Sequence, residues 1–521
     1  MATASALRRS EPDLLFALLA AFSLAGLSFL VQGHVGLGLR DEGFLWYGVE
    51  RTLLGEVPLR DFRAYDPGRY LWCAAWMKVL GPGIVALRLS SAIFQALGLA
   101  CGMLAARRAV ANRWMLVPVG AVLLLWMIPP WKLFEPSLAM AAVLVGVRLL
   151  ERPTPLRHAV AGAFVGFAAF FGRNHGLYTA VALAGLAGLA CLKVDRATPG
   201  RKLGAFVAGI GLGCVPLLAM LLFTPGFREA FVESVRSSFA QDQWNAPLSV
   251  PWPWKVPVRG SSLAAVATGW GVGACFLALP VFLAVAIATA VRARRDVFPR
   301  TALLAACGFV GVTYAHHAWV RSDFLHLAQA IPPFWIGLLA FPAAFGAASA
   351  GAWASRIAWA ALVFGVAAIG PQSAIARKLA PIRPELAPVR VEVAGDALTV
   401  DGETARILDR LTGFVRARVG AGEVVWFSSH LASLYPILGR RSPVWDIYPA
   451  WKADEEGQAR MDRELEPVDW EILADEPAYN PGLALSKTYP RAWAMLSREF
   501  EPVPVEGLPS WIHVSRRRRT R

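Results

Sequence analysis

Two adjacent carboxylates, Asp41 and Glu42, follow the first long apolar segment of this 521-residue chain, and Asp61, Arg63 and Arg69 come soon after them. A positioned carboxylate can act as a general base toward a hydroxyl group, and arginines can stabilise the negative charge that develops on a phosphate leaving group. Carboxylates only a few residues beyond a membrane span are usually held by a function or by a partner. These residues predict a polar site for group transfer at a membrane surface.

Each of these residues also has a purely structural interpretation. Asp41 at the start of a helix fits an N-cap, and Glu42 fits a first-turn acid that favours the helix dipole or, alternatively, a metal ligand. The D-P-G run at residues 66–68 is a turn signal, so Asp61, Arg63 and Arg69 fit either a turn or a polar lining. We predict Asp41 as the general base and Glu42 as a second catalytic acid.

Two later clusters add candidates for binding a substrate or a phosphate. Arg173 and His175 occupy a short turn between apolar segments, and Arg321, Asp323 and His326 lie in the run RSDFLHLAQAIPP. Arginine binds phosphate well through its fork of N–H donors. The alternative for Arg173 is a side chain that extends to lipid headgroups.

A metal site is left open. Glu135, in PPWKLFEP, opens another apolar segment, and it fits either a metal or substrate ligand or a first-turn acid; Asp41 is the other candidate metal ligand. The pair His316–His317 has no third ligand at a fixed spacing, so zinc is not predicted. His430 opens a predicted helix and fits a cap or packing residue. Because the chain has no P-loop, G-x-G-x-x-G or G-x-S-x-G motif, nothing supports use of a nucleotide.

The composition is that of an integral membrane protein. Hydrophobic residues make up 56% of the chain and charged residues 17%, whereas globular domains average about 45–50% and about 25%. The formal net charge is +15, but the basic residues fall in short clusters between apolar runs, and this pattern excludes a nucleic-acid-binding surface. Frequent Ala, Gly, Leu and Arg suggest a GC-rich bacterial genome, and hence a bacterial plasma membrane.

A bilayer-crossing helix needs about 20 mostly apolar residues, and about eleven segments meet that test. They are residues 13–31, 83–106, 114–130, 133–150, 158–172, 176–193, 203–223, 262–291, 301–318, 326–348 and 352–370. Every second connecting loop is rich in Lys and Arg, which predicts that these loops and the N-terminus are cytoplasmic. Residues 32–82 and the region after about residue 370 are then predicted to lie outside.

The outer segments have their own predicted structure. Apolar and aromatic residues at helical spacing predict two interfacial helices within outer loop 31–82. Strand and helix patterns alternate after residue 385, which predicts a small α/β domain: strands at 391–400, 422–429, 468–473 and 511–517, and helices at 402–419, 430–439, 454–465 and 491–503. The predicted organisation is a transmembrane catalytic domain 1–370, a linker 371–384 and an extracytoplasmic domain 385–521, which we expect to bind the acceptor or to brace the outer loops.

The stretch DEGFLWYGVERTLLGEVPLRDFRAYDPGRYLW resembles the first outer loop of GT-C-type polytopic glycosyltransferases. It is most similar to the group of protein-O-mannosyltransferases, aminoarabinose transferases and Rgt-like proteins, close to glycosyltransferase family 39. That group carries an acidic motif after the first helix and then a G-x-x-P-x-x-D-F…P-G run. In this chain these are Asp41, Glu42, Gly55, Pro58, Asp61, Phe62, Pro67 and Gly68. RSDFLHLAQAIPP resembles a late outer motif of the group.

This resemblance implies a polytopic α-helical membrane enzyme with the GT-C fold. It implies transfer of a sugar, with inversion, from a polyprenyl-phosphate-linked donor to a hydroxyl of a lipid, glycan or protein acceptor, with Asp41 as the general base. Some relatives have a D-x-D or D-x-E motif in the loop where this chain has only Glu135, so metal dependence stays open. The alternative function is a transporter or flippase of lipid-linked envelope intermediates.

Overall fold

The computed structural model describes residues 2–240, 248–370, 387–475 and 483–518. The chain divides into two compact units. A helical unit contains residues Met1–Val31, Leu89–Ala219 and Pro247–Arg377, and a mixed unit contains Gln32–Arg88, Met220–Ala246 and Lys378–Arg521. By its contacts, the first outer loop therefore groups with the C-terminal segment and not with the long helices. The predicted linker 371–384 lies outside the described residues.

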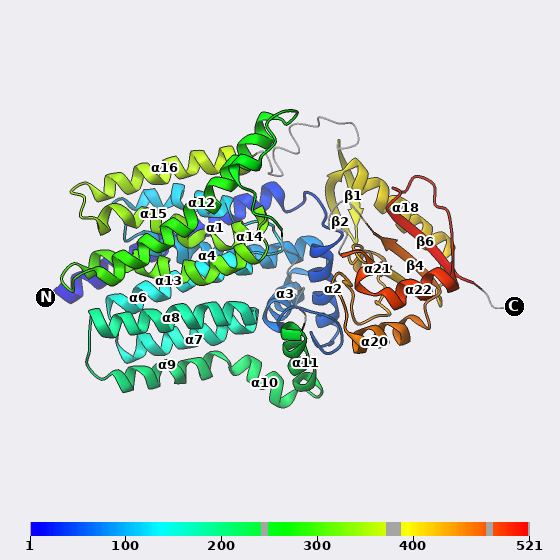
Figure 1. Ribbon diagram of the computed structural model, residues 1–521, viewed down its shortest axis with the longest axis horizontal. Helices are drawn as coiled ribbons and strands as arrows, with labels where there is room; N and C mark the ends of the chain where they lie inside the picture. The colour runs from blue at the N-terminus through cyan, green and yellow to red at the C-terminus, as the bar shows by residue number, and fades with distance from the viewer. Residues whose placement is uncertain (1, 241–247, 371–386, 476–482, 519–521) are drawn as a thin grey trace. The chain divides into compact units, whose positions relative to one another are not determined.

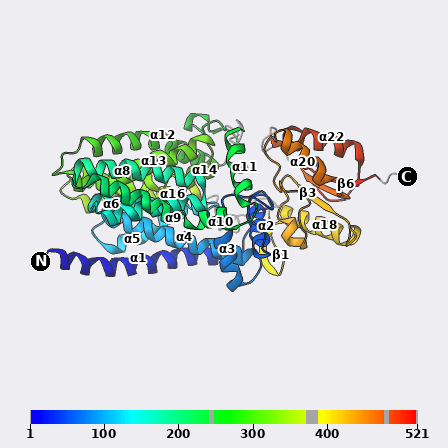
Figure 2. The ribbon, with the colours of Figure 1, turned by 90° about the horizontal axis from the view of Figure 1, so that it is seen from below.

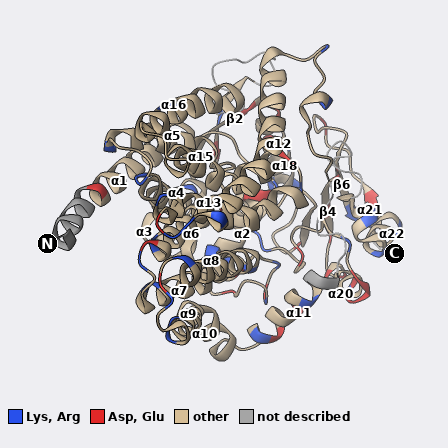
Figure 3. Ribbon diagram, turned by 60° about the vertical axis from the view of Figure 1, so that its left-hand side comes forward, with Lys and Arg blue, Asp and Glu red and all other residues tan. Residues whose placement is uncertain are grey.

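The helical unit is built of helices, and the longer ones run alongside one another (Figures 1 and 2). They are α1 (Ala2–Gln32), α4 (Ile84–Ala106), α5 (Leu116–Leu125), α6 (Phe134–Glu151), α7 (Pro155–Phe171), α8 (Arg173–Lys193), α9 (Pro199–Gly213), α10 (Val215–Phe223), α12 (Leu263–Arg292), α13 (Phe298–Val320), α14 (Phe324–Ala330), α15 (Pro332–Ala344) and α16 (Ala350–Ile369). Most of their ribbon is uncharged (Figure 3).

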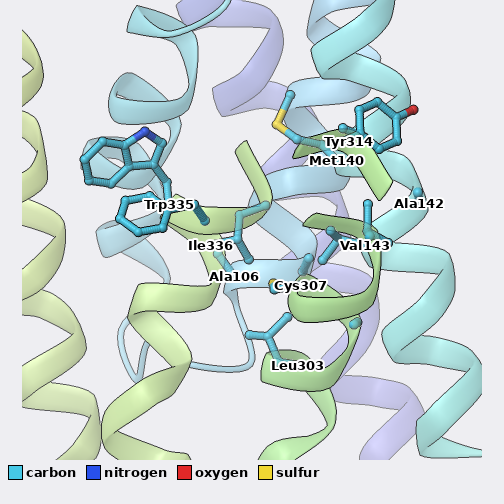
Figure 4. Packing of buried hydrophobic residues seen from close by; sticks show 14 of the residues in the cluster. Ala106, Met140, Ala142, Val143, Leu303, Cys307, Tyr314, Trp335 and Ile336 are labelled. Carbon is cyan, nitrogen blue, oxygen red and sulfur yellow. The ribbon is translucent and has the colours of Figure 1, made fainter. Parts of the chain in front are cut away.

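Small residues and a large apolar core hold these helices together. Gly162 and Gly166 on α7 face Gly209 and Gly213 on α9, and a Cβ added at any of the four would clash with backbone atoms of the opposite helix. Glycines four residues apart allow helices in a membrane to approach closely. Elsewhere the core is built from apolar side chains of α4, α6, α13 and α15, including Ala106, Met140, Cys307 and Ile336 (Figure 4).

Six helices of the described residues are long and apolar enough to cross a membrane: Asp13–Gln32 of α1, and α4, α8, α12, α13 and α16. The count rises to eight if the bent pairs α9–α10 and α14–α15, each with an angle of 52°, are single spans. The chain is thus built as a multi-pass membrane protein. The predicted number of about eleven is not confirmed, because segments such as α5 and α7 are too short to pass the same test.

The mixed unit begins with two helices from the first outer loop, α2 (Asp41–Leu53) and α3 (Pro67–Leu80), and also contains α11 (Phe227–Ala240). Both predicted loop helices are therefore present. However, α2 is more buried than a helix lying on a membrane with one apolar face, because every residue from Glu42 to Val49 is buried. Gly48 makes this possible, since a Cβ there would clash with the Tyr70 ring.

The C-terminal segment forms the predicted small α/β region, with two sheets. Strands β1 (Pro388–Val393) and β2 (Asp396–Asp401) pair as an antiparallel hairpin, where one strand had been predicted. The second sheet has the order β3-β4-β6-β5, with β3 (Val425–Ser428) parallel to β4 (Trp470–Ala474), and β6 (Ile512–Arg517) antiparallel to β4 and to β5 (Phe500–Pro502). The helices are α18 (Gly402–Arg418), α19 (Leu434–Leu438), α20 (Glu455–Leu465), α21 (Leu485–Thr488) and α22 (Pro490–Glu499).

Candidate functional site

The two neighbouring carboxylates at the start of α2 have different environments. Glu42 is 1% exposed and forms a two-pronged ion pair with Arg88, in which Arg88 Nε donates to Oε1 at 2.7 Å and Nη2 donates to Oε2 at 2.8 Å. The backbone N–H of Gly38 donates to the same Oε2 at 2.8 Å. Both oxygens of Glu42 are therefore occupied by protein donors.

Arg88 extends this network to the segment that leads into α2. Its guanidinium donates to the carbonyl oxygens of Gly33 and Gly36, each at 2.8 Å. Because the Arg88 side chain is only 7% exposed, these bonds form away from bulk water, where charge-assisted hydrogen bonds are strongest. The geometry favours a structural role for Glu42, in which it fixes the approach of residues 33–38 to α2.

Asp41 is the first residue of α2, and Arg40 occupies the N-cap position without a side-chain capping bond. The N-cap alternative for Asp41 is therefore not realised. Within the described residues, no hydrogen bond or ion pair to the Asp41 carboxylate is found. The side chain is partly exposed, so this carboxylate, unlike that of Glu42, is available to a ligand.

His430 lies close enough to the start of α2 for the charges of Arg40 and Asp41 to act on it, although it is far away in the sequence. Burial lowers the pKa of His430 to about 3, and the positive charge of Arg40 acts in the same direction, while the charge of Asp41 opposes both. His430 is consequently neutral at physiological pH. The sequence suggested only a cap or packing role for this residue.

A series of aromatic contacts connects His430 with Arg69. The guanidinium carbon of Arg69 lies 4.6 Å from the ring centroid of Tyr65, and Arg69 is buried. The Tyr65 ring lies 5.1 Å from Phe44, which lies 5.8 Å from Tyr448. The Tyr448 ring in turn lies 6.0 Å from His430. Asp41 and Arg69, both predicted site residues, thus belong to one cluster that also includes His430.

The other two predicted residues of this loop are engaged in holding its shape. Asp61 accepts hydrogen bonds from Arg60 Nε and from the backbone N–H of Val57, at 2.8 and 2.7 Å. The Arg60 bonds also hold the pKa of Asp61 below its usual value. Arg63 donates to the buried carboxylate of Asp446 at 2.5 Å. Their contacts fit the structural alternative for both residues.

The remaining predicted residues lie in the helical unit, and several of them meet around a group of histidines. His175, buried near the start of α8, stacks on Tyr314 of α13 at 5.6 Å and lies 6.2 Å from His317. The Tyr178 hydroxyl is hydrogen-bonded to His316 Nδ1 at 2.8 Å. This group combines one predicted residue with tyrosines that the sequence did not single out.

The late outer motif continues the same group. Asp323 caps α14 by accepting from the backbone N–H of His326, and its carboxylate also contacts His326 Nδ1 at 2.8 Å. Arg321 lies 3.4 Å from Asp323, and the His326 ring lies 5.1 Å from that of His317. The structure therefore brings Arg321, Asp323 and His326 together, next to the His175 group.

Two predicted residues of the helical unit have less definite surroundings. Glu135 is buried in the first turn of α6, and Arg173 is the first residue of α8. Over the described parts of the chain, no group of three or more His, Cys, Asp or Glu side chains could hold a metal ion. Asp41 and Glu135 also belong to different units, so the metal site proposed for them stays a prediction.

Arg88, Asp446 and His430 were missed by the sequence interpretation. Arg88 lies inside a predicted membrane-spanning segment, where an arginine is unusual and calls for a partner; this signal was present in the sequence but was not used. His430 follows two serines at the end of a strand, a position where ligands often bind in α/β sheets. No sequence pattern indicated Asp446.

Comparison with known proteins identifies the fold. No family model matches the chain, and no curated protein matches it. Among solved structures, it is similar to the crystal structure of ArnT from Cupriavidus metallidurans bound to undecaprenyl phosphate, with 13% identity, a TM-score of 0.51, and coverage of 99% of this chain and 98% of that chain. The apo structure of the same ArnT aligns with a TM-score of 0.42 and 13% identity, over 98% of each chain. The chain therefore has the fold of ArnT over almost its whole length, which confirms the GT-C-type membrane fold that the first outer loop predicted.

Proposed function

We propose that this protein is a membrane glycosyltransferase that transfers a sugar from a polyprenyl-phosphate-linked donor to a hydroxyl group of an acceptor. The observation that carries the proposal is the ArnT-like fold over nearly the full chain, since that ArnT was crystallised with undecaprenyl phosphate. The environment of Asp41, a carboxylate at the start of α2 that makes no hydrogen bond within the described residues, supports its proposed role as the base.

In the proposed reaction, Asp41 accepts the proton of the acceptor hydroxyl as its oxygen attacks the anomeric carbon of the donor sugar. The new carbon–oxygen bond forms on the face opposite the leaving group, so the configuration inverts. The bond between the anomeric carbon and the phosphate oxygen breaks, and the polyprenyl phosphate leaves with the electron pair. General-base catalysis of this kind contributes about 10²–10⁴-fold to the rate.

The leaving phosphate needs cationic groups. Of the proposed arginines of the first outer loop, Arg69 belongs to the cluster that contains Asp41. We therefore assign phosphate binding in the mixed unit to Arg69. In the helical unit, Arg173, His175 and the Arg321–Asp323–His326 group are proposed to contact the donor. A divalent cation remains a proposal for Asp41 or Glu135.

We place the reaction at the outer face of a bacterial plasma membrane. Basic loops alternate along the sequence, which puts the N-terminus in the cytoplasm by the positive-inside rule. Residues 33–40 separate the end of α1 from Asp41, so the base lies a short distance beyond the first span. In this topology the C-terminal α/β region is also extracytoplasmic.

A transporter or flippase of lipid-linked intermediates is the second candidate. It is favoured by the bent pairs α9–α10 and α14–α15, each broken by 52°, because transporters commonly build substrate sites from interrupted helices. In this candidate Asp41 has no chemical step to perform. The effect of removing its basicity separates the two functions.

The test is the Asp41→Asn variant in a deletion strain, with cell-envelope glycans measured by mass spectrometry. We expect loss of the dependent glycan by at least about 100-fold while the protein reaches the membrane at a normal level. Asp409→Asn, an exposed site on α18, is the matched control and should restore the glycan fully. Restoration by Asp41→Asn would refute the assignment of the base and favour the transporter.

A further inference from the structure

Strand β3 ends at Ser428, and the loop that follows continues with Ser429 and His430, so three polar side chains stand in succession; we call residues 428–430 the Ser428–Ser429–His430 loop. Strand β3 is completely buried and lies parallel to β4. Ligands of α/β sheets bind beyond the carboxyl ends of such strands. The chain turns sharply here, since His430 N–H donates to the Ser428 carbonyl at 2.9 Å and Ser429 adopts a left-handed conformation with φ 59°. A serine held at positive φ is uncommon and suggests a constraint beyond packing.

These side chains are buried, and each has a polar atom without a hydrogen-bond partner in the described part of the chain. Ser428 is 0% exposed, Ser429 1% and His430 7%. Ser428 Oγ, Ser429 Oγ and His430 Nδ1 form no hydrogen bond within the described residues. A buried polar group without a partner destabilises the folded state, because it has lost its hydrogen bonds to water. Three such groups in adjacent residues indicate that the loop forms hydrogen bonds with a molecule other than the protein itself.

The loop is fixed against the start of α2, which carries Asp41. Ser433 N–H donates to the Leu39 carbonyl at 3.1 Å, and Ser433 Oγ donates to the Gly38 carbonyl at 2.9 Å. A Cβ on Gly43 would clash with Ser433, so the two segments are in direct contact. The charge of Asp41 reaches His430. A molecule bound by the loop would therefore lie beside the proposed base.

The chemistry of the loop fits hydroxyl groups better than phosphate. Two serine hydroxyls and a neutral imidazole each donate or accept hydrogen bonds without adding charge. The Tyr448 ring lies 6.0 Å from His430, and Phe44 lies 5.8 Å from Tyr448. Aromatic rings provide an apolar surface for the C–H face of a sugar, and neutral polar groups beside them bind its hydroxyls. A phosphate site would instead be expected to converge several Arg or Lys side chains.

We propose that the Ser428–Ser429–His430 loop binds the hydroxyl groups of a sugar ring next to Asp41. The identification of this ring as part of a carbohydrate acceptor rests on the proposed glycosyltransferase function. The acceptor class then narrows to a glycan or glycolipid whose attacking hydroxyl is presented to Asp41. The C-terminal region thereby contributes directly to the binding of the acceptor.

The test measures binding and not turnover. The full-length protein is placed in phosphatidylcholine nanodiscs, which avoids sugar-based detergents, and saturation-transfer difference NMR is recorded with methyl glycosides of glucose, galactose, mannose and arabinose. Variants Ser428→Ala and Ser429→Gly remove the hydroxyls without disturbing the fold, since glycine tolerates the positive φ of residue 429. His430→Gln removes the imidazole.

We expect at least one glycoside to give a saturable signal that falls at least five-fold in all three variants. The exposed residues Ser497 and His513 provide the matched controls, Ser497→Ala and His513→Gln, which should keep the wild-type signal. The inference is overturned if no glycoside binds, or if the three variants bind the glycosides as well as the wild type does.

This result can be separated from the test of the proposed function. Asp41→Asn should retain glycoside binding while it loses sugar transfer. If Asp41→Asn still supports transfer, the proposed function fails even when the loop binds sugar. If the loop variants bind glycosides normally, this inference fails even when Asp41 is essential.

Discussion

Removal of the carboxylate of Glu42 should unfold the first outer loop locally rather than affect chemistry alone. In Glu42→Gln, Arg88 keeps its bonds to the carbonyls of Gly33 and Gly36 but loses the Glu42 carboxylate, to which it is bonded at 2.7 and 2.8 Å. Side chains of this pair are 1% and 7% exposed. Breaking a buried ion pair by removing one partner costs about 3–5 kcal/mol, because the other charge stays buried.

Hydrogen exchange of the α2 amides measures this cost. Each 1.4 kcal/mol changes an equilibrium constant about tenfold, so the protection of α2 in Glu42→Gln should fall by about two to four orders of magnitude. The double variant Glu42→Leu/Arg88→Met removes both charges and should recover much of the protection, since apolar replacements of a buried pair are often neutral or stabilising.

The same unit provides a matched control. Glu229 pairs with Arg228 at 2.9 Å, but these side chains are 63% and 73% exposed. Exposed pairs contribute about 0.2–1 kcal/mol, so Glu229→Gln should leave exchange nearly unchanged. The reasoning is refuted if the protection factors of the α2 amides in Glu42→Gln stay within a factor of ten of those in the wild type. If that variant loses sugar transfer with normal protection, the catalytic interpretation of Glu42 is favoured instead.

Three further predictions concern the mixed unit. Burial, reinforced by a neighbouring aspartate, raises the pKa of Glu471 from 4.5 to about 8. Because the folded state then binds this proton more tightly than the unfolded state, the stability of the wild type falls as the pH rises from about 4.5 to about 8. Glu471→Gln should therefore have a higher melting temperature than the wild type at pH 8.5 but not at pH 4.5. Gly43→Ala should cost about 1–3 kcal/mol of α2 stability in hydrogen exchange, because the new methyl group clashes with Ser433. Arg63→Met leaves Asp446 buried with the Tyr489 hydroxyl at 2.6 Å, and should cost about 3 kcal/mol, seen as faster proteolysis of the first outer loop.

The chain offers controls for these variants. Gly413 has nothing within 4 Å of an added Cβ, so Gly413→Ala should be neutral or stabilising, and an equal loss at both glycines would contradict the steric argument. Arg498 pairs with Glu499 but is 75% exposed, and Arg498→Met should leave proteolysis unchanged. A Glu471→Gln variant that is stabilised equally at both pH values would contradict the titration argument.

Many of the helices could be predicted, because a membrane-spanning helix is recognised from the length and apolar composition of its own segment. The segment predicted at 83–106 is α4 at Ile84–Ala106, and that at 262–291 is α12 at Leu263–Arg292. The segments 203–223 and 326–348 were predicted as single spans but are bent pairs. Proline accounts for the second break, since Pro332 and Pro333 lack the N–H that a continuous helix needs. Apolar composition alone does not register such a break.

The site was predictable only in part, because a residue type indicates a possible chemistry but not its partners. Asp41 and Glu42 have neighbouring positions and similar side chains. Both carboxylate oxygens of Glu42 accept hydrogen bonds from the protein, whereas those of Asp41 accept none within the described residues. The difference is set by Arg88, 46 residues after Glu42, one of 52 basic residues in the chain. The spacing of apolar residues along the sequence does not show which of these basic residues pairs with Glu42. The contribution of His430 has the same origin, since only the tertiary fold places it beside Asp41.

The contacts of the mixed unit also determine how the C-terminal region can be studied. Deletion of residues 385–521 is the obvious test for a role in acceptor binding. That deletion would also remove Ser433, which holds the start of α2, and Asp446, which pairs with Arg63. It would also expose the part of α2 that packs on this region, at Gly43 and Tyr47. Loss of transfer after deletion would therefore follow from collapse of the first outer loop, whatever the region binds. Single-atom changes such as Ser428→Ala, which remove a hydroxyl and leave these anchors intact, are the variants that can distinguish a binding role from a bracing one.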